Sequence, residues 1–351
     1  MSNALRYVAI GLAVLIVLGL GSSMLRDDTP QPVQSLKHSY SKSLDQARNG
    51  QPGAARVLYQ QLARTDLTPK RRIALLVQLP NYPSPQALKL ADADLANPSA
   101  EVRLAAIDSI HGLVPGPQRS LLLGPLLDDQ EQAIRFAATR ALLGLNAVDL
   151  GLYSAPLDKV LDEYKQFLQA QTQSSSAQLQ LARLYLHDGD FPPASEALAR
   201  ALKLDPDNLQ AIATQVQLLD RQGLADQARQ VLADQLTRHP DSAFLQQELG
   251  LWLLHHDQSE YALLAFARAL ELAPDNNDYR YTLAISLHSL DLIGPAQQQL
   301  EDILRRQPAN RKARVLLIEY WKETGQLQNV QVLQAELEQQ NPDDPALQQG
   351  L

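Results

Sequence analysis

The sequence contains no cysteine, few aromatic residues and no surplus of basic residues. The absence of cysteine excludes disulfides, thiolate metal sites, covalently attached c-type haem, lipid anchoring through cysteine and cysteine nucleophiles. The 351 residues carry a formal net charge of −8, whereas modules that bind nucleic acid usually have a basic surplus. We therefore expect no nucleic-acid partner.

Motifs that carry enzyme chemistry are also missing. No GxxxxGK[ST], GxGxxG, GxSxG or HExxH occurs, so phosphate loops, dinucleotide turns, hydrolase elbows and zinc-protease helices have no support. Of seven histidines only His255 and His256 are adjacent, and neighbouring helical residues point about 100° apart, unlike the i, i+4 pairs of helical metal sites. We expect no enzyme activity, no catalytic residue, no metal, no cofactor and no small-molecule substrate.

A long apolar run lies near the amino terminus. Residues 7–25 (YVAIGLAVLIVLGLGSSML) contain no charge and approach the roughly 20 residues that span a bilayer as a helix. Residues 1–26 are therefore predicted to be a transmembrane anchor or a signal sequence. The anchor is favoured because a cleavable signal has a shorter apolar stretch, and Gly19 to Ser23 is a passable but not a strong match to a cleavage site. Residues 27–40, with two prolines, are predicted to be a stalk.

The carboxyl-terminal half repeats with a fixed period. Prolines recur at one constant interval, at Pro206, Pro240, Pro274, Pro308 and Pro342. When the chain from residue 175 onward is divided into windows of this length, small residues align at one position of the window and apolar residues at another. The small column is Ala194, Ala228, Ala262 and Ala296, and the apolar column includes Leu181, Leu249, Leu283 and Leu317.

This pattern resembles the tetratricopeptide repeat, a helix–turn–helix unit with small residues where its helices touch and a proline after the second helix. Five repeats are predicted over residues 175–344, followed by a tail, 345–351. The turns around Pro206 and Pro274 supply helix caps such as Asn208 and Asn276. The last helix, residues 329–340, is strongly polar and is expected to be the solvated cap.

A weaker repeat lies upstream. Residues 97–106 (NPSAEVRLAA) align with residues 129–138 (DQEQAIRFAA) at an offset of 32. This is similar to HEAT repeats, and residues 41–150 are predicted to form about three such helix pairs. The recurring Arg103 and Arg135 are expected to contact the preceding helix. Residues 151–174 are predicted to be a connecting helix and linker.

The expected fold is an all-α, right-handed helical-repeat solenoid, HEAT-like and then tetratricopeptide, with one amino-terminal transmembrane helix. The order of HEAT-like helices and tetratricopeptide repeats also resembles the carboxyl-terminal half of bacterial multihaem cytochromes, without their haem part. Because those cytochromes are exported, the resemblance implies that the soluble part faces the periplasm, and the apolar run then predicts a single-pass protein of the bacterial inner membrane. Basic residues flank the apolar run on both sides and do not decide the orientation.

Tetratricopeptide arrays bind partners on the concave groove lined by the first helix of each repeat. The resemblance transfers this role to Gln180, Arg183, His187, Gln217, Arg221, Phe244, Gln247, Tyr281 and His288. The Lys and Asn of the family's carboxylate clamp are absent, since Arg183 and Gln217 stand among the corresponding positions. The groove is expected to hold an extended or helical peptide of a protein partner.

The expected function is a membrane-anchored protein-binding scaffold or assembly factor, and the family resemblance extends this to assembly of an exported or respiratory complex. One alternative is a cytoplasm-facing adaptor in envelope or polysaccharide assembly. Another is an enzyme without a recognisable motif. Residues 175–351 carry 14 Lys and Arg against 24 Asp and Glu, which favours a partner with a basic or neutral surface.

Overall fold

The computed structural model describes residues 39–348, which are helical and contain no strand. The predicted amino-terminal span and most of the stalk lie outside this range. Within it, no helix has both the length and the apolar character needed to cross a bilayer. The described helices belong to one compact unit.

The amino-terminal block of the described range contains nine α-helices with three short 3₁₀ turns between them. They are α2 (Tyr40–Arg48), α3 (Ala54–Leu62), α4 (Pro69–Leu76), α5 (Pro85–Asp94), α6 (Ala100–Leu113), α7 (Gly116–Leu123), α8 (Gln132–Leu142), α9 (Ala147–Leu150) and α10 (Ser154–Gln169). The two aligned segments, residues 97–106 and 129–138, include the beginnings of α6 and α8. Each buries its branched residue and paired alanines, Val102, Ala105 and Ala106 in α6 and Ile134, Ala137 and Ala138 in α8.

In the carboxyl-terminal half of the described chain, ten helices form five pairs, and a short helix follows them. The pairs are α11 (Ser175–Asp188) with α12 (Phe191–Leu204), α13 (Leu209–Arg221) with α14 (Ala225–Arg238), α15 (Ala243–His255) with α16 (Ser259–Leu272), α17 (Asn277–His288) with α18 (Ile293–Arg306), and α19 (Arg311–Glu323) with α20 (Leu327–Gln340). The final helix is α21 (Pro345–Gln348). The first helices begin where the sequence windows begin, so the predicted helix–turn–helix period is confirmed.

Helix caps fix this register. The residue before each first helix accepts a hydrogen bond through its side chain from the backbone three residues on. These caps recur at the interval of the prolines, at Ser174, Asn208, Ser242, Asn276 and Asn310. Because the cap satisfies one of the helix's free N–H groups, it sets where each first helix starts.

Small residues bring the helices of a pair together. The four aligned alanines of the second helices are at most 1% exposed. In the third pair, Gly250 of α15 faces α16 so closely that a Cβ placed on it would lie 2.4 Å from the Phe266 ring. The sequence alignment of small residues therefore marks the contacts between helices.

The hydrophobic core is interrupted around α14. One cluster runs through the amino-terminal block into α13, and a second extends from α16 to α20. Between them lies a small cluster of Val216, Ala228, Leu232 and Trp252. Helix α14 buries only Ala228 and Leu232, so the packing between the second and third repeats is the thinnest in the array.

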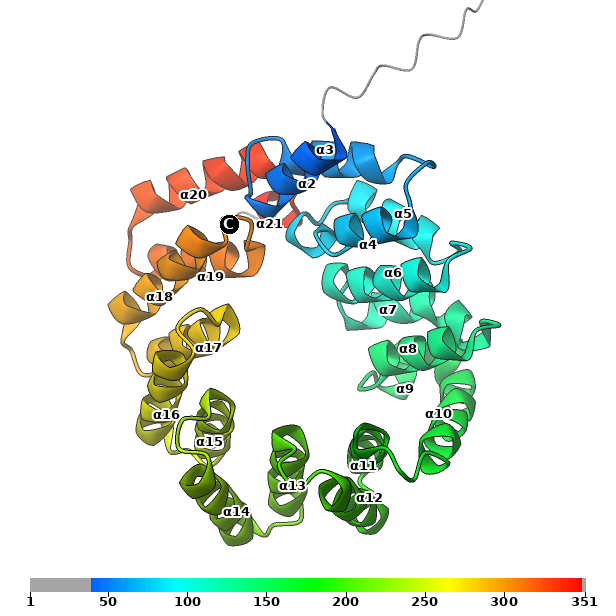
Figure 1. The fold of residues 1–351 in the computed structure, drawn as a ribbon. Coiled ribbons are helices and arrows are strands. Elements are labelled where there is room, and N and C mark those ends of the chain that lie inside the picture. Colours follow the sequence, from blue (N-terminus) through cyan, green and yellow to red (C-terminus); the bar gives the residue numbers. More distant parts are fainter. Residues whose placement is uncertain (1–38, 349–351) are drawn as a thin grey trace, which may run out of the picture. The chain divides into compact units, whose positions relative to one another are not determined.

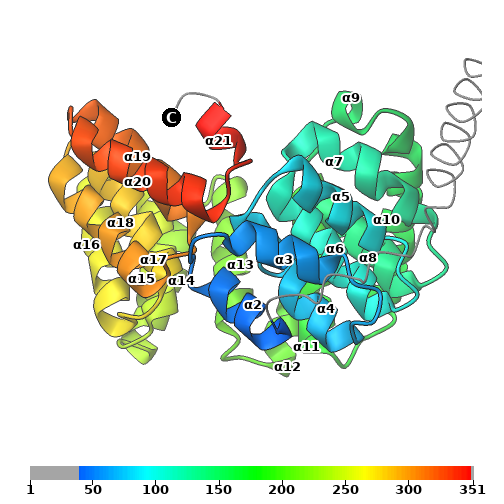
Figure 2. The same ribbon diagram turned by 90° about the horizontal axis from the view of Figure 1, so that it is seen from above.

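The last repeat returns to the first helices, a contact that the sequence did not predict (Figure 1). The backbone N–H of Gly53 donates to the Gln339 carbonyl at 2.7 Å, and the Asn341 side-chain amide donates to the Pro83 carbonyl at 2.7 Å. Ala309 belongs to the core cluster of the amino-terminal helices. Figure 2 shows the end of α20 beside α3 from a second direction. We call these interactions the closing contact.

Helix α20 keeps most of its side chains exposed, in line with the cap expected there. Its carboxyl end differs, because Gln340 and Asn341 are buried. Asp344 is 0% exposed and pairs with Arg311 at 2.6 Å. The end of the array is therefore covered by the beginning of the described chain rather than by solvent alone.

Candidate functional site

The inner surface of the five repeats is formed by their first helices. Figure 1 shows α13, α15, α17 and α19 on the inner side and α14, α16, α18 and α20 on the outer side. Equivalent positions on successive first helices are one repeat length apart, so Arg183, Gln217 and Leu251 form one row across three repeats. The period thus presents a regular row of side chains along the inner surface.

The predicted residues of the first repeat are exposed and take part in contacts within the array. Gln180 accepts a hydrogen bond from the Tyr164 hydroxyl at 2.6 Å. Arg183 donates to the Thr214 hydroxyl at 3.3 Å. His187 lies 3.1 Å from Asp188. These contacts orient the side chains without burying them.

Of the predicted residues of the second and third repeats, two line a cavity and two are half-buried or buried. Gln217 and Arg221 line a cavity of about 300 Å³ between α13 and α15. Arg221 also donates to the Leu186 carbonyl and lies over the Phe191 ring. Phe244 is half-buried. Gln247 is 8% exposed, so its placement on the open groove is wrong: it packs inside the repeat.

The predicted residues of the fourth repeat, Tyr281 and His288, make ring contacts with side chains of the fifth repeat. The Lys312 ammonium lies 4.0 Å from the centre of the Tyr281 ring. His288 stacks on Tyr320 with ring centres 3.9 Å apart, and its Nε2 lies 2.6 Å from a Glu323 oxygen. Burial, followed by the charges of neighbouring groups, raises the pKa of Tyr320 to about 12, so this phenol stays neutral at physiological pH.

The sequence did not predict the charged and aromatic residues Asp220, Glu248, Trp252 and His255, which also line the cavity between α13 and α15. Asp220 accepts from His256 at 2.6 Å and lies 3.4 Å from His255. The signal in the sequence is the spacing, because residues about one repeat length apart lie on neighbouring first helices. The transferred positions follow this spacing from His187 to Arg221 but do not continue to His255 on α15.

Glu248 and Arg183 carry opposite charges in partly desolvated surroundings. Burial raises the pKa of the Glu248 carboxyl, and the Arg183 charge only partly opposes this. Burial likewise lowers the pKa of the Arg183 guanidinium, while the Glu248 charge acts in the other sense. No ion pair joins the two side chains among the residues that the structure describes, so neither charge is neutralised by direct contact.

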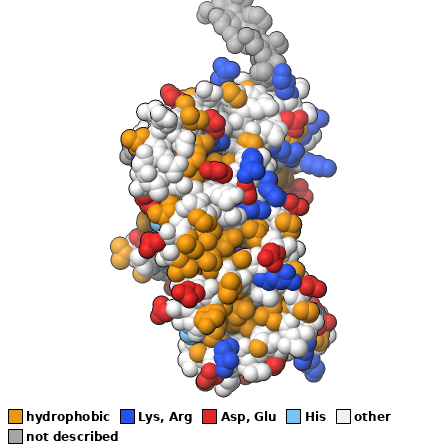
Figure 3. All heavy atoms as spheres, turned by 90° about the vertical axis from the view of Figure 1, so that its left-hand side faces the viewer, with side chains coloured by type: hydrophobic (Ala, Val, Ile, Leu, Met, Phe, Trp, Pro, Cys, Tyr) orange, Lys and Arg blue, Asp and Glu red, His pale blue; other side chains and the backbone are white. Residues whose placement is uncertain are grey.

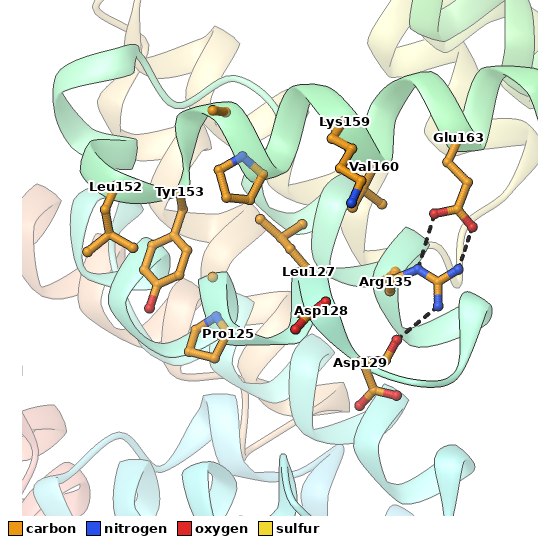
Figure 4. Close-up of a pocket in the computed structure, with 13 residues that line it drawn as sticks. Pro125, Leu127, Asp128, Asp129, Arg135, Leu152, Tyr153, Lys159, Val160 and Glu163 are labelled. Atoms are coloured by element: carbon orange, nitrogen blue, oxygen red, sulfur yellow. Dashed lines mark hydrogen bonds and ion pairs between the residues drawn. The ribbon is translucent and has the colours of Figure 1, made fainter.

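A larger cavity, of about 760 Å³, lies in the amino-terminal block between α8 and α10 (Figure 4). Arg135, which lines this cavity, forms an ion pair with Glu163 and donates a hydrogen bond to the Asp129 carbonyl at 2.9 Å. Arg103 repeats this arrangement with the Asn97 carbonyl and Asp129. Both arginines were expected to contact the preceding helix. They instead join their own turn to a carboxylate further along the chain.

The outer surface has an apolar groove on the third repeat. It is lined mainly by Leu249 and Leu253 of α15 and by Tyr261 and Leu264 of α16. Tyr261 and Leu264 are 64% and 67% exposed. Figure 3 views the side on which α16 and α18 lie and shows hydrophobic side chains gathered there.

No described group of three or more His, Asp or Glu side chains is arranged to hold a metal ion within residues 39–348. The charged groups of the two cavities come from turns and helices that also build the repeats. The chemistry that these surfaces offer is hydrogen bonding, ion pairing and apolar contact.

No protein-family model and no curated protein sequence matches the chain. Among solved structures, the chain is similar to yeast Tom70 with 13% identity, a TM-score of 0.49 and coverage of 89% of this chain and 63% of the other. It is similar to TTC0263, a tetratricopeptide protein of Thermus thermophilus, with 21% identity, a TM-score of 0.41 and coverage of 58% and 98%. It is also similar to Pseudomonas aeruginosa pilF, with 18% identity, a TM-score of 0.39 and coverage of 67% of this chain and 98% of the other.

Proposed function

We propose that the protein is a protein-binding scaffold or assembly factor that holds a segment of its partner on the inner surface of α11, α13, α15, α17 and α19. The supporting observation is the row of side chains that recurs once in each repeat along this surface. Such a row matches an elongated or helical peptide, since each repeat contacts the next stretch of the bound chain. The mechanism is recognition, without a chemical step.

The proposal includes attachment to the bacterial inner membrane. Its support is the uncharged run at residues 7–25. In this arrangement the repeats face the periplasm and assist the assembly of an exported or respiratory complex. The alternative is a cytoplasm-facing adaptor in envelope or polysaccharide assembly. A green fluorescent protein fused to the carboxyl terminus fluoresces in the cytoplasm and not in the periplasm, so fluorescence of the fusion would support the alternative.

The test of partner binding is a crosslinking pull-down from membranes. The native chain is compared with the variant Arg183→Ala, Arg221→Ala, Tyr281→Ala, which removes three side chains of the inner surface. The matched control is Arg229→Ala, Arg268→Ala, Tyr261→Ala, which removes the same residue types from the outer helices α14 and α16. Circular dichroism checks that helicity is retained in each.

We expect specific partners to be lost from the inner-surface variant and kept by the control. The reverse result would move the interface to the outer apolar groove that contains Tyr261. If both variants keep the same partners, the inner surface is not the binding site and the proposal fails.

A further inference from the structure

The cavity between α13 and α15 contains a carboxylate that the protein leaves without a partner. Glu248 is half-buried, and in the described range it forms neither a hydrogen bond nor an ion pair. The other carboxylate of the cavity, Asp220, is satisfied by His255 and His256. Because removing a carboxylate from water without a compensating contact is unfavourable, Glu248 is the position at which a ligand gains most.

A second unsatisfied group lines the same cavity. Trp252 is 8% exposed, and its indole N–H has no hydrogen-bond acceptor among the described residues. Next to it Leu251 is 43% exposed although it is apolar. The wall therefore combines an apolar strip, formed by Leu251 and Trp252, with one free acceptor, Glu248.

The cations around Glu248 are engaged elsewhere. Arg221 donates to the Leu186 carbonyl, and His255 lies against Asp220. Arg183 donates to Thr214 and to Gln210, at 3.3 and 3.4 Å. The charge of Arg183 acts on Glu248 from a distance without forming a direct pair. A ligand cation that enters the cavity thus meets an available carboxylate.

We propose that this cavity receives a lysine or arginine side chain of the bound partner segment, whose cationic group pairs with Glu248 while its aliphatic stem lies along Leu251 and Trp252. This inference rests on the proposed function and specifies the chemistry of the partner. Lysine and arginine combine a charged head with an apolar stem, which matches the two kinds of wall. The acidic excess of residues 175–351, 24 Asp and Glu against 14 Lys and Arg, favours the same kind of partner.

The chain provides its own probe, because it has two tryptophans, Trp252 in the cavity and Trp321 in the fifth repeat. The full-length chain labelled with nitrogen-15 gives two indole N–H signals, which a Trp252→Phe variant assigns. The probes are Nα-acetyl-lysine N-methylamide and the arginine equivalent. The neutral control probe is Nα-acetyl-norleucine N-methylamide, which has the stem without the charge.

We expect both cationic probes to shift the Trp252 signal with saturation and to leave the Trp321 signal unchanged. Norleucine amide should cause less than a third of that shift. Glu248→Gln should remove the response to the cations, and Glu260→Gln, which removes an exposed carboxylate of α16, should leave it intact. An equal response to norleucine, or an unchanged response in Glu248→Gln, would overturn the proposal.

The two proposals fail separately. If the inner-surface variant loses its partners but the cationic probes do not act through Glu248, partner binding on the groove stands and the cation site falls. If the probes act through Glu248 while the inner-surface variant keeps every partner, the cation site stands and the proposed scaffold surface falls.

Discussion

At the scale of single residues, the inner surface contains charges that the fold does not neutralise. The pKa of Glu248 is raised by burial, so the folded state binds its proton more tightly than the unfolded state does. This carboxyl therefore lowers stability as pH rises from the unfolded-state pKa through the raised folded-state pKa, and above that pH its effect is constant. The same property makes the group available to a partner.

The first prediction concerns this cost. Glu248→Gln should raise the free energy of unfolding at pH 7, where the carboxylate of the unfolded chain is charged, and should change it little at pH 3.5, where the carboxyl is protonated in the folded and the unfolded state. Urea denaturation at the two pH values measures the difference. The same measurements on Glu260→Gln should show no gain at pH 7. A loss of stability in Glu248→Gln at pH 7 would mean that the carboxylate is satisfied in the folded state.

A second prediction concerns Gly250, where two helices touch. Gly250→Ala places a Cβ 2.4 Å from the Phe266 ring, so the helices must separate, at a cost of about 1–3 kcal/mol. Gly294→Ala is the control, because no atom lies within 4 Å of a Cβ there. Alanine favours a helix, so that control should be neutral or slightly stabilising, by less than about 1 kcal/mol. Urea denaturation of both variants checks this, and equal effects would contradict the close contact.

At the scale of helices and turns, both halves of the chain use the same arginine arrangement. Arg103, Arg135, Arg280 and Arg314 each donate to the carbonyl six residues earlier and pair with a carboxylate further along the chain. For the last two the carboxylates are Asp302 and Glu336. Each arginine thereby ties the turn before its helix to a later element.

The third prediction tests this arrangement. Arg314 is 2% exposed, so Arg314→Ala leaves the Pro308 carbonyl without its donor and should cost about 2 kcal/mol. Arg305→Ala removes an exposed arginine paired with Asp302 three residues earlier and should cost less than about 1 kcal/mol. Thermal unfolding of both variants provides the comparison. Similar losses would show that Arg314 contributes no more than a surface pair.

The sequence predicts these elements well where the determinants are local. Caps such as Asn208 and Asn276 and the aligned alanines lie within one repeat, so periodicity alone locates the helices. The carboxylates that pair with Arg103 and Arg135 lie 26 and 28 residues ahead, and no periodic signal indicates on which side of the helix they fall. In the candidate site, the predicted residues do lie on first helices, but Glu248 was missed and Gln247 is buried inside its repeat.

At the scale of the whole described unit, the closing contact joins segments that are distant in sequence. The Asn341 to Pro83 hydrogen bond spans 258 residues. Tyr59 of α3 lines a cavity together with Pro342 and Asp343 of the last turn. Burial raises the pKa of Tyr59 to about 12, the hydrogen bond from Ser84 opposes this, and the charges of Asp343 and Asp344 add to it. Because neither segment repeats the other, no sequence pattern predicts that they meet.

The fourth prediction tests that contact. Gly50 has φ +57°, and a Cβ on it would lie 2.7 Å from the Pro308 carbonyl oxygen. Gly223 has φ +76° with nothing within 4 Å. Alanine at either position strains the backbone, but only Gly50→Ala should separate the two ends.

Hydrogen exchange measured by mass spectrometry distinguishes the two variants. Gly50→Ala should speed exchange of the Gly53 amide, the donor to Gln339, by at least about tenfold, equivalent to about 1.4 kcal/mol of local stability. Gly223→Ala should leave that amide unchanged. Equal exchange in both variants would show that Gly50 is not part of the closing contact.

The closing contact also changes how the array can come apart. A linear array frays from its two ends, because a terminal repeat has a single neighbour and is lost when one interface opens. Here the last repeat has neighbours on both sides, so no repeat is released until two interfaces have broken. A segment that opens alone stays tethered beside its partner at high effective concentration, and re-formation is fast. The thin packing at α14 can therefore open without starting the unravelling of the array.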